Sequence, residues 1–191
     1  MKAIREAVGQ DLQWSSKQMG LFAEDEFALR AGDEVLALIH AREKGTDWIC
    51  GEAADGRWAL QCRNIGPGEI VVIRELDSQA ETAKVKRGRK HGLFQRDNDY
   101  LAFSDGRLVT WKKASKWHDE WDWVDTAGRP LIHFQRGHHV VIEPLAFALP
   151  ELSLLVIVGW HLMILQEEAK KKAAVTAAVA TTTSSSVIVH H

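Results

Sequence analysis

One short stretch concentrates the positive charge of this chain. The segment "KVKRGRKHG", residues 84 to 92, has no acidic residue, and its cations are Lys84, Lys86, Arg87, Arg89 and Lys90. At a membrane surface such a stretch attracts anionic headgroups by about 1 kcal/mol per charge. We therefore predict a site here for anionic phospholipid or phosphoinositide, with a solvated hairpin loop as the alternative. DNA or RNA would engage more basic surface than one loop, so no nucleic-acid partner is expected.

A second stretch, "WKKASKWHDEWDW" from residue 111 to 123, combines tryptophans with acidic residues. Trp121 and Trp123 share one face of a strand, and we expect them to pack inside the protein. His118, Asp119 and Glu120 have side chains that suit a metal ion, but adjacent residues on a strand point to opposite faces. We therefore expect no metal site here.

The remaining histidines also give little sign of metal binding. His133, His138 and His139 lie near Gly137, and His133 is expected to approach His139 across a hairpin. Zinc needs three or four convergent ligands, and the two cysteines have no CxxC spacing. His161 lies inside an apolar stretch and is interpreted as a core histidine. We predict neither a metal nor a cofactor.

No familiar catalytic motif occurs in the sequence. It contains no GxSxG, phosphate-binding loop, dinucleotide fingerprint or HExxH. We therefore expect a protein that is not an enzyme. A cryptic hydrolase built from scattered residues is the alternative.

The composition is that of a soluble globular protein. The 191 residues are 46% hydrophobic and 26% charged, with a net charge of -2, which fits one domain and argues against a dedicated nucleic-acid binder. A hairpin turning at Ala54-Asp55 would put Cys50 and Cys62 on opposite sheet faces, so no disulfide is expected. The first residues lack the apolar core of a secretory signal, and we expect a cytoplasmic protein.

Most of the chain is expected to form short antiparallel strands with turns about ten residues apart. Three Gly-Arg steps recur at these turns, at Gly56, Gly106 and Gly128, and two of the glycines follow an aspartate, which is typical of hairpins with primed turns. The predicted strands are 35–40, 47–52, 57–63, 70–75, 82–86, 92–96, 100–104, 107–113, 120–125, 130–136 and 138–143.

The sequence predicts a helix at about residues 150–168 that is apolar on every side. From Leu152 to Leu165 it would be about 21 Å long, which is too short for a bilayer core of about 30 Å. A helix without a polar face must be enclosed. We therefore expect a closed β-barrel with the helix through its centre, and Gly159 where a barrel side chain approaches the helix. The alternative is a helix between a sheet and a dimer partner.

These patterns divide the chain into three segments. Residues 1–26 form an N-terminal segment of uncertain structure, and "DEFALRAGDEV" is predicted to contain a strand that ends at Gly32-Asp33. Residues 27–168 are predicted to form the barrel with its helix. Residues 169–191 are expected to extend the helix and then to form a disordered tail rich in Ala, Thr and Ser.

The strand series followed by "LPELSLLVIVGWHLMIL" resembles the tubby C-terminal-like superfamily, within it the LURP-one-related and phospholipid-scramblase-like group. The resemblance covers Phe27 to Gln166, and its most specific parts are the Gly159-Trp160 step and the preceding "GRPLI" hairpin. It implies a barrel of about twelve strands around a hydrophobic helix. It also implies association with membrane lipids or a role as an interaction module.

Two features of scramblases are missing from the sequence: the acidic calcium-binding segment before the helix and the N-terminal cysteine cluster. Calcium-dependent lipid scrambling is therefore not expected. We expect instead a module that binds membrane phospholipid or a protein partner through surface loops, with peripheral contact at the inner membrane face at most. A membrane-inserted, scramblase-like protein whose helix leaves the barrel is the alternative.

Overall fold

The computed structural model describes residues 1–17, 26–40, 48–65, 68–86, 88, 90–91, 95–96, 98–115 and 118–185. The chain divides into two compact units, Met1–Gly159 and Trp160–His191. The first unit contains every strand in the described part of the chain.

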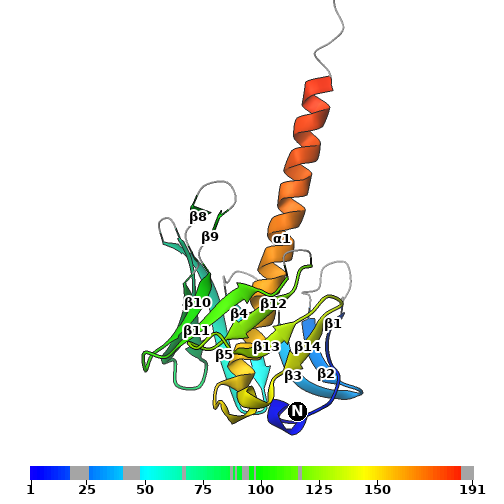
Figure 1. Cartoon of the computed structure of the whole chain (residues 1–191). Helices are drawn as coiled ribbons and strands as arrows, with labels where there is room; N and C mark the ends of the chain where they lie inside the picture. The colour runs from blue at the N-terminus through cyan, green and yellow to red at the C-terminus, as the bar shows by residue number, and fades with distance from the viewer. Residues whose placement is uncertain are drawn as a thin grey trace, which may run out of the picture. The chain divides into compact units, whose positions relative to one another are not determined.

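The strands of the first unit form a closed antiparallel barrel, as the sequence predicted (Figure 1). Going round the barrel, the order is β1-β14-β13-β12-β11-β10-β7-β6-β5-β4-β3-β2, so nearly all neighbours are joined by hairpins. Its strands are β1 (Leu12–Lys17), β2 (Glu26–Ala31), β3 (Glu34–His40), β4 (Trp48–Ala53), β5 (Gly56–Ile65), β6 (Gly68–Glu75), β7 (Glu81–Lys86), β10 (Asp99–Phe103), β11 (Leu108–Lys113), β12 (Trp121–Val124), β13 (Pro130–Phe134) and β14 (His139–Ile142).

Two parts of the barrel differ from the strand series read from the sequence. Strand β1 lies in the N-terminal segment, after the 3-10 helix η1 (Ile4–Glu6), and closes the barrel by pairing with both β2 and β14. The expected strand at 92–96 does not join the barrel. Its described part, β9 (Gln95–Arg96), pairs with β8 (Lys90–His91) in a separate two-stranded sheet, and β7 pairs directly with β10.

The beginning of helix α1 (Leu152–Ser185) fills the barrel. Leu152 and the residues from Leu154 to Val158 are 0–1% exposed. Trp123 on β12 donates from its indole nitrogen to the carbonyl oxygen of Leu155 at 2.8 Å. Gly51 on β4 faces Ile157 so closely that a side chain at position 51 would overlap it. The first part of the apolar helix, Leu152 to Gly159, is therefore enclosed by the strands, as its lack of a polar face predicted.

Gly159 lies where barrel side chains approach the helix most closely, as expected from the sequence. A Cβ atom at this position would lie 2.6 Å from Cε2 of Phe134 and 2.8 Å from Nε1 of Trp123. Real Cβ atoms do not come so close to other heavy atoms. The glycine is therefore needed for contact between α1 and strands β12 and β13.

Helix α1 continues well beyond the predicted limit at residue 168. It ends at Ser185, so the expected extension is helical through most of the tail. By length and composition, its segment Leu152–Thr176 is long and apolar enough to cross a membrane, although core helices of soluble proteins pass the same test. His161, interpreted from the sequence as a core residue, is fully buried.

The turns and the cysteines are arranged as predicted from the sequence, except that Gly56 does not lie in a turn with positive φ. Gly106 and Gly128 have positive φ angles of 89° and 79°, as their turns require. The β4–β5 hairpin forms, but its corner is Ala54-Asp55 and Gly56 pairs with Ala53, so no positive φ is needed there. The pairing of Cys50 with Ala59 puts Cys50 and Cys62 on opposite faces of the sheet, and no disulfide joins them, as expected.

Candidate functional site

The cationic stretch predicted as the binding site begins on β7. Lys84 and Lys86 alternate with the buried residues Ala83 and Val85, so both lysines point out of the barrel. Arg87 and Arg89 lie outside the described residues, and of Lys90 only the backbone is described, in β8. The amide of Gly88 donates to Oδ1 of the buried Asp99 at 2.8 Å. This bond holds the start of the cationic stretch against β10.

Strand register brings two further cations beside these lysines. Arg63 on β5 and Lys86 on β7 are both paired with Ile70 of β6, so they lie in one row across the sheet. Neighbouring strands are about 4.8 Å apart, which puts the Cα atoms of Arg63 and Lys86 about 10 Å apart. Arg74 lies further along β6, on the same outer face. We call Arg63, Arg74, Lys84 and Lys86 the cationic face.

The cations of this face differ in their partners. Lys84 forms an ion pair with Glu81 at 2.7 Å. Arg63, Arg74 and Lys86 have no carboxylate partner among the described residues. Arg74 lies over the ring of Trp48 at 5.5 Å, and Lys86 over the ring of Tyr100 at 5.9 Å. Aromatic rings hold Arg74 and Lys86 without neutralising them, so among the described residues Glu81 is the carboxylate paired with a cation of this face.

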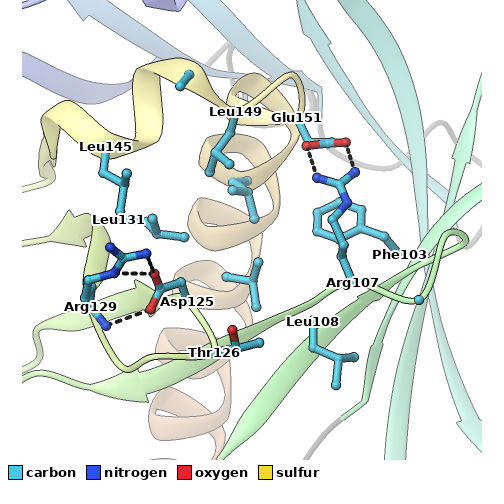
Figure 2. Close-up of a pocket in the computed structure, with 14 residues that line it drawn as sticks. Phe103, Arg107, Leu108, Asp125, Thr126, Arg129, Leu131, Leu145, Leu149 and Glu151 are labelled. Atoms are coloured by element: carbon cyan, nitrogen blue, oxygen red, sulfur yellow. Dashed lines mark hydrogen bonds and ion pairs between the residues drawn. The ribbon is translucent and has the colours of Figure 1, made fainter.

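A second candidate site is an apolar pocket of about 410 Å³ at one end of the barrel (Figure 2). It lies between the β10–β11 turn, the β12–β13 turn, the 3-10 helix η2 (Pro144–Ala148) and the start of α1. Its apolar side chains are Phe103, Leu108, Val109, Leu131, Leu145, Ala148, Leu149 and Leu155. Because these come from several separate elements, no local pattern in the sequence groups these apolar residues together.

Two similar turns form opposite sides of this pocket. In the β10–β11 turn, Asp105 accepts the backbone N–H of Arg107 at 3.0 Å and its Nε–H at 2.6 Å. In the β12–β13 turn, Asp125 accepts the same two groups of Arg129 at 2.8 and 2.7 Å. Both turns belong to the Gly-Arg steps of the sequence, which predict hairpin turns but no binding pocket.

Glu151, the residue before α1, links the β10–β11 turn to the start of the helix. Both terminal nitrogens of Arg107 donate to the two carboxylate oxygens of Glu151, and the guanidinium also lies over the ring of Phe103 at 5.1 Å. Figure 2 shows this pair and the Asp125–Arg129 pair on two sides of the leucines. The two arginines, each paired with a carboxylate, therefore lie at the rim of the pocket.

These contacts shift the titration of the charged groups at the rim. The pKa of Asp105 is lowered, mainly by the hydrogen bond from the backbone of Arg107 and then by its side chain. The pKa of Asp125 is lowered mainly by the backbone N–H of Arg129. The pKa of Arg107 is raised by its hydrogen bonds to Glu151 and Asp105. All three groups therefore keep their charges at neutral pH.

The histidines contact carboxylates. His133 lies between two of them, with Nδ1 2.7 Å from Asp122 and Nε2 3.0 Å from Glu143, whereas His139 contacts Asp11. The register pairs His133 with Val141, two residues along β14 from His139. Among the residues that the structure covers, no group of His, Cys, Asp and Glu is arranged to hold a metal ion.

Of the tryptophans predicted to pack inside, Trp123 is fully buried and Trp121 is partly buried. Trp111 stacks on Trp121 at 5.6 Å and contacts Trp123 at 4.8 Å and Phe134 at 5.2 Å. Trp117 lies outside the described residues. His118 and Asp119 lie between β11 and β12, where Asp119 is 3.9 Å from Lys113. This stretch therefore contributes to the core.

Comparison of the chain with protein-family models, with curated proteins and with solved structures found no match.

Proposed function

We propose that this chain is a binding module of the tubby C-terminal-like superfamily, in its LURP-one-related and scramblase-like group, and that it binds anionic phospholipid surfaces without catalysing a reaction. The closed antiparallel barrel with a C-terminal apolar helix supports the assignment. In this proposal the protein is cytoplasmic and contacts the inner face of the membrane peripherally.

The observation that carries the proposal is the set of cations without carboxylate partners. Arg63, Arg74 and Lys86 point out of neighbouring strands, and the described residues leave all three unneutralised. A protein with a net charge of -2 has no general attraction for anions. Its attraction must come from such a local patch, to which Arg87, Arg89 and Lys90 add charge in the sequence.

The expected energy of this contact is moderate and depends on salt. Each cation near an anionic leaflet contributes about 1 kcal/mol, and added salt screens the attraction over about 8–10 Å. Trp48 and Tyr100, which lie under two of the cations, are residue types that suit the interface between headgroups and water. The cationic face therefore fits reversible binding at a surface.

Co-sedimentation with vesicles tests this proposal. The triple variant Arg63→Ala/Arg74→Ala/Lys86→Ala should lose binding to phosphatidylcholine vesicles that contain phosphatidylserine. A matched variant, Lys2→Ala/Arg30→Ala/Arg136→Ala, removes the same charge from other strands and turns and should bind like wild type. Equal binding by all three proteins would refute the proposal.

The part of the cationic stretch after β7 needs its own variant. Arg87→Ala/Arg89→Ala/Lys90→Ala should weaken binding further when it is added to the triple variant, because its charges continue the cationic face along the chain. If this variant alone abolishes binding while the triple variant binds normally, the site lies at residues 87 to 90 and Arg63, Arg74 and Lys86 contribute nothing.

Membrane insertion is the second candidate, because Leu152–Thr176 could span a bilayer by length and composition. Leu152 and the residues from Leu154 to Val158, at 0–1% exposed, would then have to leave the interior of the barrel. Carbonate extraction separates the two proposals. An inserted protein stays with the membrane fraction, whereas a peripheral module is released.

A further inference from the structure

The pocket at the end of the barrel has the size and the lining of a small-molecule site. Its volume of about 410 Å³ falls within the range of about 300–1,000 Å³ that is typical of ligand pockets. Leu131 and Leu155, at 2% and 1% exposed, form its inner wall. Leu108 and Leu145 stand at its mouth and are 45% and 43% exposed. Large apolar side chains with that exposure, beside an apolar cavity, favour an apolar occupant.

The charges at the rim decide which kind of occupant fits. Arg107 donates through Nε and both terminal nitrogens to Asp105 and Glu151. Arg129 donates to Asp125 through Nε and Nη2. Three carboxylates thus face two guanidinium groups, so the rim has no unpaired positive charge for an anion. An anionic ligand would have to break one of these pairs or lie against a carboxylate.

We propose that this pocket binds an uncharged apolar small molecule, with the chemistry of a straight alkyl chain that ends in a hydroxyl group. The chain lies among the leucines, and the hydroxyl group lies at the mouth, where Thr126, a polar residue of the lining, supplies a hydroxyl partner. The pocket shares no residue with the cationic face, so this function goes beyond binding of membrane phospholipid and does not depend on it.

Competition between two probes of equal chain length tests the charge argument. Nile red, an uncharged dye, reports the apolar pocket by fluorescence, and 1-decanol and decanoate compete for it. Decanol should displace the dye at a concentration about tenfold lower than decanoate, because the carboxylate would lose water without gaining an unpaired cation. Equal or better displacement by decanoate would overturn the proposal.

Substitutions at the mouth locate the site. Leu145→Asp and Leu108→Asp each put a charge on an apolar wall at a position exposed enough to leave folding intact, and each should weaken decanol binding about tenfold. Val8→Asp is the matched control, since Val8 is 61% exposed and lies outside the pocket lining. Circular dichroism verifies that all three variants fold. If the leucine variants fold and bind decanol like the control, the pocket is not the site.

The two proposed functions can fail separately. The triple variant of the cationic face should bind decanol like wild type, and Leu145→Asp should bind anionic vesicles like wild type. Loss of decanol binding in the triple variant would overturn the independence of the two sites.

Discussion

The inner and outer faces of the barrel wall are made by alternate residues of the same strands, yet their side chains differ greatly in how closely they are packed. On β12, Trp123 points inward and bonds to the carbonyl of Leu155, and Gly159 fits against it with no room for a methyl group. On β5 to β7, the outward cations have few and weaker contacts: Arg74 and Lys86 lie over aromatic rings, and Lys84 forms an exposed ion pair with Glu81. The interior therefore fixes the fold, while the outer face is free to serve binding.

The largest expected effect comes from Gly159→Ala. The added methyl group overlaps Phe134 and Trp123, and overpacking of this kind costs about 1–3 kcal/mol or more. Urea unfolding should show a loss near the upper end of that range. Gly128→Ala is the control, because its Cβ meets open space and only the positive φ is strained, at about 1–2 kcal/mol. A smaller loss for Gly159→Ala than for the control would contradict the close contact.

A smaller loss is expected for Trp123→Phe. The substitution keeps an aromatic ring in the core but removes the donor to Leu155, and a buried hydrogen bond contributes about 0.5–1.5 kcal/mol. Trp48→Phe makes the same change on the outer face and should alter the free energy of unfolding by less than about 0.5 kcal/mol. Equal losses in thermal or urea unfolding would remove the contrast between the two faces.

At the rim of the barrel, Asp125 is expected to stabilise the fold in a pH-dependent way. Its pKa in the folded protein lies below the ordinary value of 3.8, so its contribution is present above about pH 4 and is lost as the pH falls through the lowered pKa. The melting temperatures of wild type and Asp125→Asn should differ at pH 7 and converge below pH 3.8. A difference that does not change with pH would refute this role.

The smallest effect on stability is expected for Arg63→Ala. Its guanidinium contacts Gln61 on the exposed surface, so the free energy of unfolding should change by less than about 0.5 kcal/mol. Vesicle binding should nevertheless weaken about fivefold, which corresponds to the loss of about 1 kcal/mol. Unchanged binding would remove Arg63 from the cationic face.

Much of the fold could be predicted from the sequence because short segments, such as the apolar helix and the hairpin turns, carry the pattern that determines it. The helix has no polar side, which requires enclosure by the strands, and its glycine marks a close contact. Strand β1 was not predicted, because "LQWSSK" has weak apolar alternation and its place depends on pairing with the distant β14. The segment 92–96 has a strand-like composition, but β7 pairs with β10 and leaves no place for it in the barrel.

The candidate sites were less predictable, because their residues come together only through strand register and the packing of distant elements. Lys84 and Lys86 were visible as a run, whereas Arg63 and Arg74 joined them only through the register of β5, β6 and β7. The pocket depends on still more of the fold, because its leucines come from strands β11 and β13, from η2 and the residue after it, and from the start of α1. The recurrent Gly-Arg steps were its only trace in the sequence.

The salt dependence of vesicle binding tests the central claim most directly. We predict that the binding constant of wild type for vesicles containing phosphatidylserine falls steeply as salt is added. The triple variant Arg63→Ala/Arg74→Ala/Lys86→Ala should bind weakly with a much flatter dependence. Parallel salt dependences for the two proteins would show that these cations do not contact the membrane, and would contradict the proposed function.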